Sequence, residues 1–100
     1  MSIQLSKPSE HMKKLCRQLG REYSIIMLDL EQVIYRNFGN GYDVEISGIN
    51  TSSEKKKATI YLWRCGRRII DTVHDVPQSE IHERVEELYH MTLEWVREVQ

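Results

Sequence analysis

The chain begins with a long amphipathic pattern in which apolar residues recur at spacings of three and four, typical of one face of an α-helix. The pattern consists of Met12, Leu15, Cys16, Leu19, Tyr23, Ile26, Met27, Leu30, Val33 and Ile34. Ser6 or Lys7, followed by Pro8, marks its start, and the Asn- and Gly-rich residues 37–41 stop it. We therefore predict one helix from about residue 8 to 36, with Gly20 as its weakest point.

From residue 42 the period changes to two. Tyr42, Val44 and Ile46 alternate with polar residues, which indicates a strand with one buried and one wet face. A polar loop follows at 48–57, and further strands are predicted at 58–65 and 68–76, joined by a tight turn at Gly66.

A second amphipathic helix closes the chain after Pro77, which ends the sheet, and Ser79, which we expect to cap the helix. Its core stripe is Ile81, Val85, Leu88, Thr92, Trp95 and Val99. The predicted fold is a single α+β domain over residues 1–100 in the order α-β-β-β-α. We expect a three-stranded antiparallel meander, with the long N-terminal helix and the C-terminal helix packed on one face.

Chain length and composition limit the number of domains and the cellular location that the sequence predicts. One hundred residues suffice for one hydrophobic core. Cys16 and Cys65 match no disulfide framework or zinc spacing, residues 1–7 lack a signal-peptide core, and no apolar run is long enough to span a membrane. We expect a cytoplasmic protein with reduced thiols and no membrane partner.

Charge is distributed unevenly along the chain. The net charge of -1 combines twelve Lys/Arg and seven Asp/Glu in the first seventy residues with eight Asp/Glu and two Lys/Arg in the last thirty. Each end therefore attracts surfaces of opposite sign. On the last helix, Glu83, Glu87, Glu94 and Glu98 fall, together with Glu80, within about 60° of arc. Such a line can imitate a phosphate backbone, although a solvated helix face is the alternative interpretation.

Two other surfaces are candidates for binding. Basic residues cluster around the predicted hairpins and would suit contacts with nucleic acid, with Tyr61 and Trp63 on the uncovered sheet face as stacking groups. The basic candidates are Lys55, Lys56, Lys57, Arg64, Arg67 and Arg68. On the first predicted helix, Ile25, Leu28 and Tyr35 form a second apolar face, which is a candidate dimer or docking face unless the helix is partly embedded.

Catalytic and metal-binding patterns are missing from the sequence. His82, Glu86 and His90 follow helical spacing, but no third metal ligand of obvious placement accompanies the two histidines. No phosphate-binding glycine loop or nucleophile motif occurs. We expect no enzymatic activity, no catalytic residues, no metal and no cofactor.

A set of strand, loop, turn and helix-start residues between 42 and about 85 forms a further pattern: Tyr42-Asp43-Val44-Glu45-Ile46-Ser47-Gly48, Ser52, Ser53, Ile60, Gly66, Ile69, Ile70, Ser79, Ile81 and Glu83. In this pattern the chain resembles small prophage anti-CRISPR proteins that inhibit type II Cas9. The resemblance implies a compact α-β-β-β-α fold and an acidic DNA mimic that occupies the DNA-recognition cleft of the effector. The second hairpin turn departs from that family, because Arg64, Arg67 and Arg68 stand where the family has acidic and amide residues.

The sequence therefore favours a small non-enzymatic protein-binding module. The specific hypothesis is a phage or mobile-element inhibitor that binds a nucleic-acid-handling effector, such as Cas9, through Glu83, Glu87, Glu94 and Glu98. A nucleic-acid-binding module using the basic hairpins and a structural homodimer are the alternatives.

Overall fold

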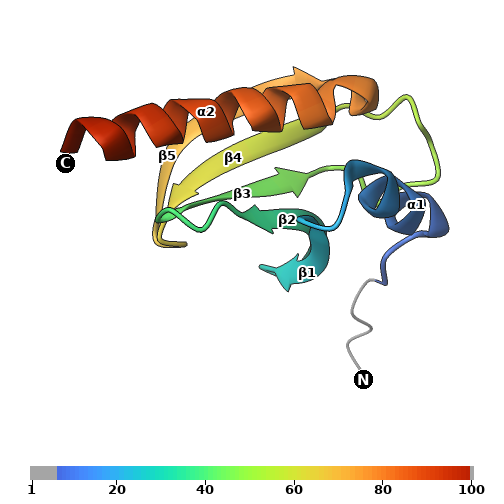
Figure 1. Cartoon of the computed structure of the whole chain (residues 1–100). Helices are drawn as coiled ribbons and strands as arrows, with labels where there is room; N and C mark the ends of the chain where they lie inside the picture. Colours follow the sequence, from blue (N-terminus) through green and yellow to red (C-terminus); the bar gives the residue numbers. More distant parts are fainter. Residues whose placement is uncertain (1–6, 100) are drawn as a thin grey trace.

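The computed structural model describes residues 7–99, which form two α-helices and a five-stranded antiparallel sheet (Figure 1). The elements are α1 (Glu10–Leu19), β1 (Ser24–Leu28), β2 (Glu31–Asn37), β3 (Tyr42–Ser47), β4 (Ala58–Arg64), β5 (Arg68–Val76), a 3-10 turn (Gln78–Glu80) and α2 (Ile81–Val99). Each strand pairs with the next one in the chain, so the sheet is a meander in the order β1-β2-β3-β4-β5. The long α2 lies across one face of this sheet and contacts β4.

The C-terminal half of the chain follows the prediction closely. The structure has strands at 42–47, 58–64 and 68–76, the predicted loop between the first two, and a helix from Ile81. The α+β class and the antiparallel meander are confirmed. Ser79, predicted as the helix cap, lies instead inside the 3-10 turn that precedes α2.

The prediction of one helix from about residue 8 to 36 is wrong. α1 ends at Leu19, because Gly20 adopts a φ of 126° and its N–H closes the last turn on the carbonyl of Cys16. The segment beyond it is rich in β-branched residues, which favour strands. It folds into the hairpin β1–β2, so the sheet has five strands rather than three. Asp29 and Leu30 connect these strands with φ values of 48° and 66°, and Leu30, predicted as core, is 71% exposed.

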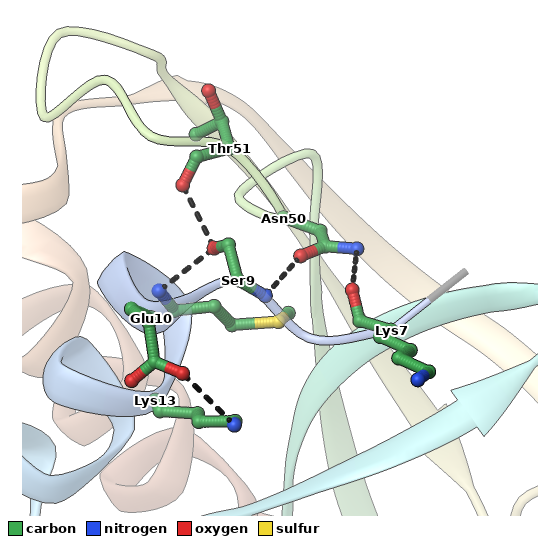
Figure 2. Close-up of polar contacts among 7 residues, drawn as sticks. Lys7, Ser9, Glu10, Lys13, Asn50 and Thr51 are labelled. Atoms are coloured by element: carbon green, nitrogen blue, oxygen red, sulfur yellow. Dashed lines mark hydrogen bonds and ion pairs between the residues drawn. The ribbon is translucent and has the colours of Figure 1, made fainter.

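The start of α1 is fixed by Ser9. The Ser9 hydroxyl accepts a hydrogen bond from a first-turn N–H at 3.0 Å and donates one to the carbonyl of Thr51 at 2.8 Å (Figure 2). The Ser9 N–H donates to the side-chain oxygen of Asn50 at 2.7 Å. The cap therefore also attaches α1 to the loop between β3 and β4. Of the predicted start residues, Lys7 precedes the helix, and Ser6 lies outside the described residues.

One hydrophobic core lies between the sheet and the two helices. The strands and helices contribute fully or almost fully buried side chains to the same cluster: Met12, Leu15, Ile34, Val44, Ile46, Ile60, Leu62, Ile81, Val85 and Leu88. The predicted stripe of α2 is confirmed at these positions and at the buried Thr92, whereas Trp95 is half-buried. The side chain of Val99 lies outside the described part of the chain.

The strand register separates the two faces of the sheet. Ile34, Ile46 and Ile60 are cross-strand partners and face the helices. The adjacent row, which includes Tyr35 and Tyr61, points to the opposite side because successive side chains alternate. We call this side, which carries Tyr35, Asp43, Glu45, Tyr61 and Trp63, the open face. The expectation that Tyr61 and Trp63 lie outside the helix-covered core is confirmed.

A buried arginine connects β2 to α2. Arg36 is only 8% exposed, and its guanidinium carbon lies 5.1 to 5.4 Å from the ring centroids of Tyr23, Phe38 and Tyr89. Its Nη1 contacts Oε1 of Glu86 at 2.7 Å and the Tyr23 hydroxyl at 3.4 Å. We call these five residues the Arg36 cluster. It provides a buried charge with both a counterion and aromatic surroundings, as such a charge requires.

Candidate docking surfaces

The predicted acidic residues lie on the solvent side of α2. Glu83, Glu87, Glu94 and Glu98 are all exposed, while the buried residues of the helix face the sheet. At 1.5 Å per residue, the line from the first to the last of these carboxylates is about 22 Å long. Arg84 contacts Glu87 at 3.4 Å, and such an exposed pair is weak. We call these four glutamates the acidic ribbon.

Apolar side chains accompany the acidic ribbon in the second half of α2. Met91 and Leu93 are 40% and 41% exposed. They line an open hollow of about 690 Å³ together with Glu87, Glu94 and Arg97. Exposed apolar groups next to charged ones are typical of a surface that contacts another protein.

The predicted basic residues lie at opposite ends of the sheet. Lys55, Lys56 and Lys57 belong to the loop between β3 and β4, whereas Arg64, Arg67 and Arg68 surround the hairpin between β4 and β5; all six are exposed. The seven residues of β4 separate the two groups by about 23 Å. The open face between them carries the carboxylates of β3, so it offers no continuous basic stripe.

The predicted dimer face does not exist as one surface. Ile25 pairs with Ile34 and packs against the main core, so it lies on the inner side of the sheet. Leu28 and Tyr35 lie on the open face, because they are an odd number of strand positions away from that pair. The three residues share a face only if the segment is a helix, and the structure has strands there.

Leu28 and Tyr35 instead line a cavity on the open face. The cavity has a volume of about 400 Å³. Its walls come from the first four strands: Ile26 and Leu28 from β1, Tyr35 from β2, Asp43 and Glu45 from β3, and Trp63 from β4. Asp29, in the turn after β1, and Gly66, in the turn after β4, complete its rim. We call it the open-face cavity.

Hydrogen bonds hold the polar side chains of this cavity in place. The Trp63 indole N–H donates to Oε1 of Glu45 at 3.0 Å. The backbone N–H of Gly66 donates to Oδ1 of Asp43 at 3.1 Å. Asp43 is only 6% exposed. The two carboxylates are therefore fixed by neutral donors rather than by a cation.

The titration behaviour of the cavity reflects this arrangement. Burial, and next the interaction of its hydroxyl with the Asp43 carboxylate, raise the pKa of Tyr35 to about 12. Burial also raises the pKa of Glu45; the hydrogen bond from Trp63 opposes this rise, and the negative charges of Glu31 and Asp29 add to it. Both shifts show that the cavity disfavours ionisation of the Tyr35 hydroxyl and of the Glu45 carboxyl.

Sequence reasoning placed Tyr61 and Trp63, which are half-buried, on the open face, but it did not single out the carboxylates that accompany them. Asp43 and Glu45 were predicted only as the wet positions of a half-buried strand. The register brings Asp43 opposite Trp63 and places Glu45 beside Tyr35. The alternation of β3 was the available signal, since it places both carboxylates on the face opposite to the apolar positions.

The histidines of α2 take part in other contacts. Glu86 is bound by Arg36, and His82 lies 4.0 Å from the same Glu86 oxygen. Within residues 7–99 no group of three or more His, Cys, Asp and Glu side chains is arranged to hold a metal ion. Neither helix of the described chain has the length and apolar character needed to cross a membrane.

Comparisons with protein-family models, with curated proteins and with solved structures found no match for this chain. Its function must therefore be inferred from the surfaces described above.

Proposed function

We propose that the chain is a small non-enzymatic module that binds a protein through the acidic ribbon of α2. The partner is a nucleic-acid-handling effector whose basic cleft accepts the ribbon in place of a phosphate backbone. The observation that carries the proposal is the exposure of all four ribbon carboxylates along one side of a single helix.

The geometry of the ribbon supports this role in two ways. Glu83 and Glu87, and likewise Glu94 and Glu98, are four positions apart, about 6 Å along the helix, and about 10.5 Å separates the two pairs. The ribbon therefore presents spaced negative charges along one line, as a phosphate backbone does. The exposed Met91 and Leu93 add apolar area beside the charges. A protein partner can use this apolar area, whereas a freely solvated helix face has no need of it.

The type of effector follows from the resemblance of residues 42 to 85 to anti-CRISPR proteins. Over these residues the structure has the strands β3, β4 and β5, the loops and turns between them and the start of α2, and the additional hairpin β1–β2 precedes them. We therefore propose a guide-loaded Cas9-type nuclease as the first partner to test. The inhibitor would compete with duplex DNA for the recognition cleft.

The test compares two triple variants of equal net charge. Glu83, Glu87 and Glu94 are changed to Gln in one, and Glu10, Glu22 and Glu54, which are exposed elsewhere, are changed to Gln in the other. Binding of each chain to a panel of guide-loaded type II Cas9 nucleases is measured by biolayer interferometry, together with cleavage of duplex DNA. We expect the ribbon variant to bind at least about tenfold more weakly, the control to bind like wild type, and added salt to weaken the wild-type complex.

Two results would contradict the proposal. Equal losses in the two triple variants would show that total charge, not the ribbon, governs binding. Direct binding of duplex DNA or RNA by the wild-type chain at about 0.15 M salt, abolished by changing Lys55, Lys56 and Lys57 to Glu, would favour the nucleic-acid-binding alternative.

A further inference from the structure

The open-face cavity is separate from the acidic ribbon, because the two lie on opposite sides of the sheet. α2 covers the face formed by the core residues, whereas the cavity opens on the other face between β1 and β4. Whatever the cavity binds can therefore be bound independently of the proposed ribbon partner.

The walls of the cavity combine two kinds of chemistry. Ile26 and Leu28 provide an aliphatic side, and Tyr35 and Trp63 provide aromatic rings. Asp43 and Glu45 provide carboxylates that neutral donors hold in place. A volume of about 400 Å³ is at the small end of the range for ligand sites, which suits one extended side chain better than a large cofactor.

No cation from the described part of the chain neutralises these carboxylates. The ion pairs of residues 7–99 join Lys13 to Glu10, Arg36 and His82 to Glu86, and Arg84 to Glu87. None of them includes a carboxylate of the cavity or of its rim. Buried or half-buried carboxylates with no counterion are costly, so a cation that enters the cavity gains both charge neutralisation and contact with aromatic rings.

We propose that the open-face cavity binds a cationic side chain, arginine or lysine, presented by a partner protein. The aliphatic stem of the side chain packs against Ile26 and Leu28, and its charged end reaches Glu45 and Asp43 beside the ring of Trp63. Asp29 at the rim adds negative charge at the entrance.

The test follows the Trp63 indole N–H by heteronuclear NMR, because this group donates directly to Glu45. Three capped tripeptides with glycine on each side of arginine, lysine or citrulline are titrated into the full chain. We expect the two cationic peptides to shift the Trp63 signal with a Kd of about 1 mM, and the neutral citrulline peptide to bind at least about tenfold more weakly. Added salt should weaken the binding of the cationic peptides.

Single-residue variants test whether the peptides bind in the open-face cavity. Glu45→Gln should weaken arginine-peptide binding about tenfold. Asp29→Asn should also weaken arginine-peptide binding. This second variant can be measured even if Glu45→Gln perturbs folding, because asparagine is well tolerated at the positive φ of residue 29. Glu54→Gln, which removes an exposed carboxylate from the loop between β3 and β4, is the matched control and should bind like wild type.

Three outcomes would overturn the proposal. The first is a citrulline peptide that shifts Trp63 as strongly as the arginine peptide, and the second is the absence of any shift with either cationic peptide. The third is a Trp63 signal that moves with protein concentration alone, which would assign the cavity to a second copy of this chain. Loss of ribbon binding in the effector assay leaves the result unaffected, so the two proposals fail separately.

Discussion

The Arg36 cluster yields the sharpest prediction about stability. Glu86→Gln keeps an acceptor oxygen near Arg36 but removes the charge that neutralises the guanidinium. The Arg36 side chain is 10% exposed and that of Glu86 is 33% exposed, with Nη1 and Oε1 2.7 Å apart. In solvent exposure, this ion pair is therefore intermediate between a fully buried pair and a surface pair.

The expected magnitude follows from these two limits. Exposed pairs contribute about 0.2 to 1 kcal/mol, whereas removing one partner of a fully buried pair costs about 3 to 5 kcal/mol. Because Glu86 is partly solvated and glutamine still accepts a hydrogen bond, we expect Glu86→Gln to lower the free energy of unfolding by about 1 to 2 kcal/mol. Replacing the pair by Arg36→Met with Glu86→Leu should cost less than that, since it leaves no unpaired charge.

The pH dependence gives an independent check. The hydrogen bond from Arg36, the largest cause, holds the pKa of Glu86 below its usual range. A carboxylate with a lowered folded-state pKa stabilises the fold at pH values above its unfolded pKa of about 4.3, and this contribution is lost as the pH falls through the folded pKa. The stability difference between wild type and Glu86→Gln should therefore be full at neutral pH and shrink below about pH 4.

Urea denaturation followed by circular dichroism, at neutral and acidic pH, measures both effects. The matched control is Glu87→Gln, on the same helix, whose exposed contact with Arg84 should contribute less than about 0.5 kcal/mol. Equal losses for Glu86→Gln and Glu87→Gln, or a Glu86 effect that persists unchanged in acid, would refute the assignment of Glu86 as the counterion of the buried arginine.

Two further predictions concern the open face and its turn. Leu30→Gly should raise the free energy of unfolding, measured by urea denaturation, by about 0.5 to 1 kcal/mol. Glycine adopts a φ of 66° without strain, and little apolar area is lost because Leu30 is exposed. Leu30→Ala keeps the strain and should give no gain. Since the pKa of Tyr35 is raised to about 12, the associated stabilisation is complete below the ordinary tyrosine pKa of about 10 and is lost as the pH rises through 12. Absorbance of the tyrosinate near 295 nm, compared between wild type and Tyr35→Phe, should show no ionisation of Tyr35 at pH 10; a normal titration there would contradict the burial of this hydroxyl.

The C-terminal half could be predicted because its patterns have only one good interpretation. In β3 the alternation of Val44 and Ile46 with polar residues fits no helix, and the stripe of α2 fits no strand. Pro77 separates the strand pattern from the helix pattern. Local pattern and tertiary environment agree here, so the sequence pattern was sufficient.

The N-terminal half was mispredicted because two interpretations compete within residues 20–36. Apolar residues at 26, 27, 30, 33 and 34 follow helical spacing, but Ile25, Ile26, Val33 and Ile34 are β-branched and prefer strands. Gly20 ends α1, and the helical spacing across the turn at Asp29 and Leu30 is a coincidence of loop length. A two-residue turn with positive φ at both positions usually reads Asn-Gly, Asp-Gly or Gly-Gly, and Leu30 after Asp29 in place of glycine removed the strongest hairpin signal.

The open-face cavity could not have been predicted even with every strand correctly placed. Period-two alternation shows that Asp43 and Glu45 share a face and that Tyr61 and Trp63 share a face. It does not show which residue of one strand lies opposite which residue of the next. That relation depends on the register, here Asp43 opposite Trp63 and Glu45 opposite Tyr61, and on β1, which carries Ile26 and Leu28 to the same cavity. The cavity is a property of four strands together, and the pattern within any single strand is not sufficient to predict it.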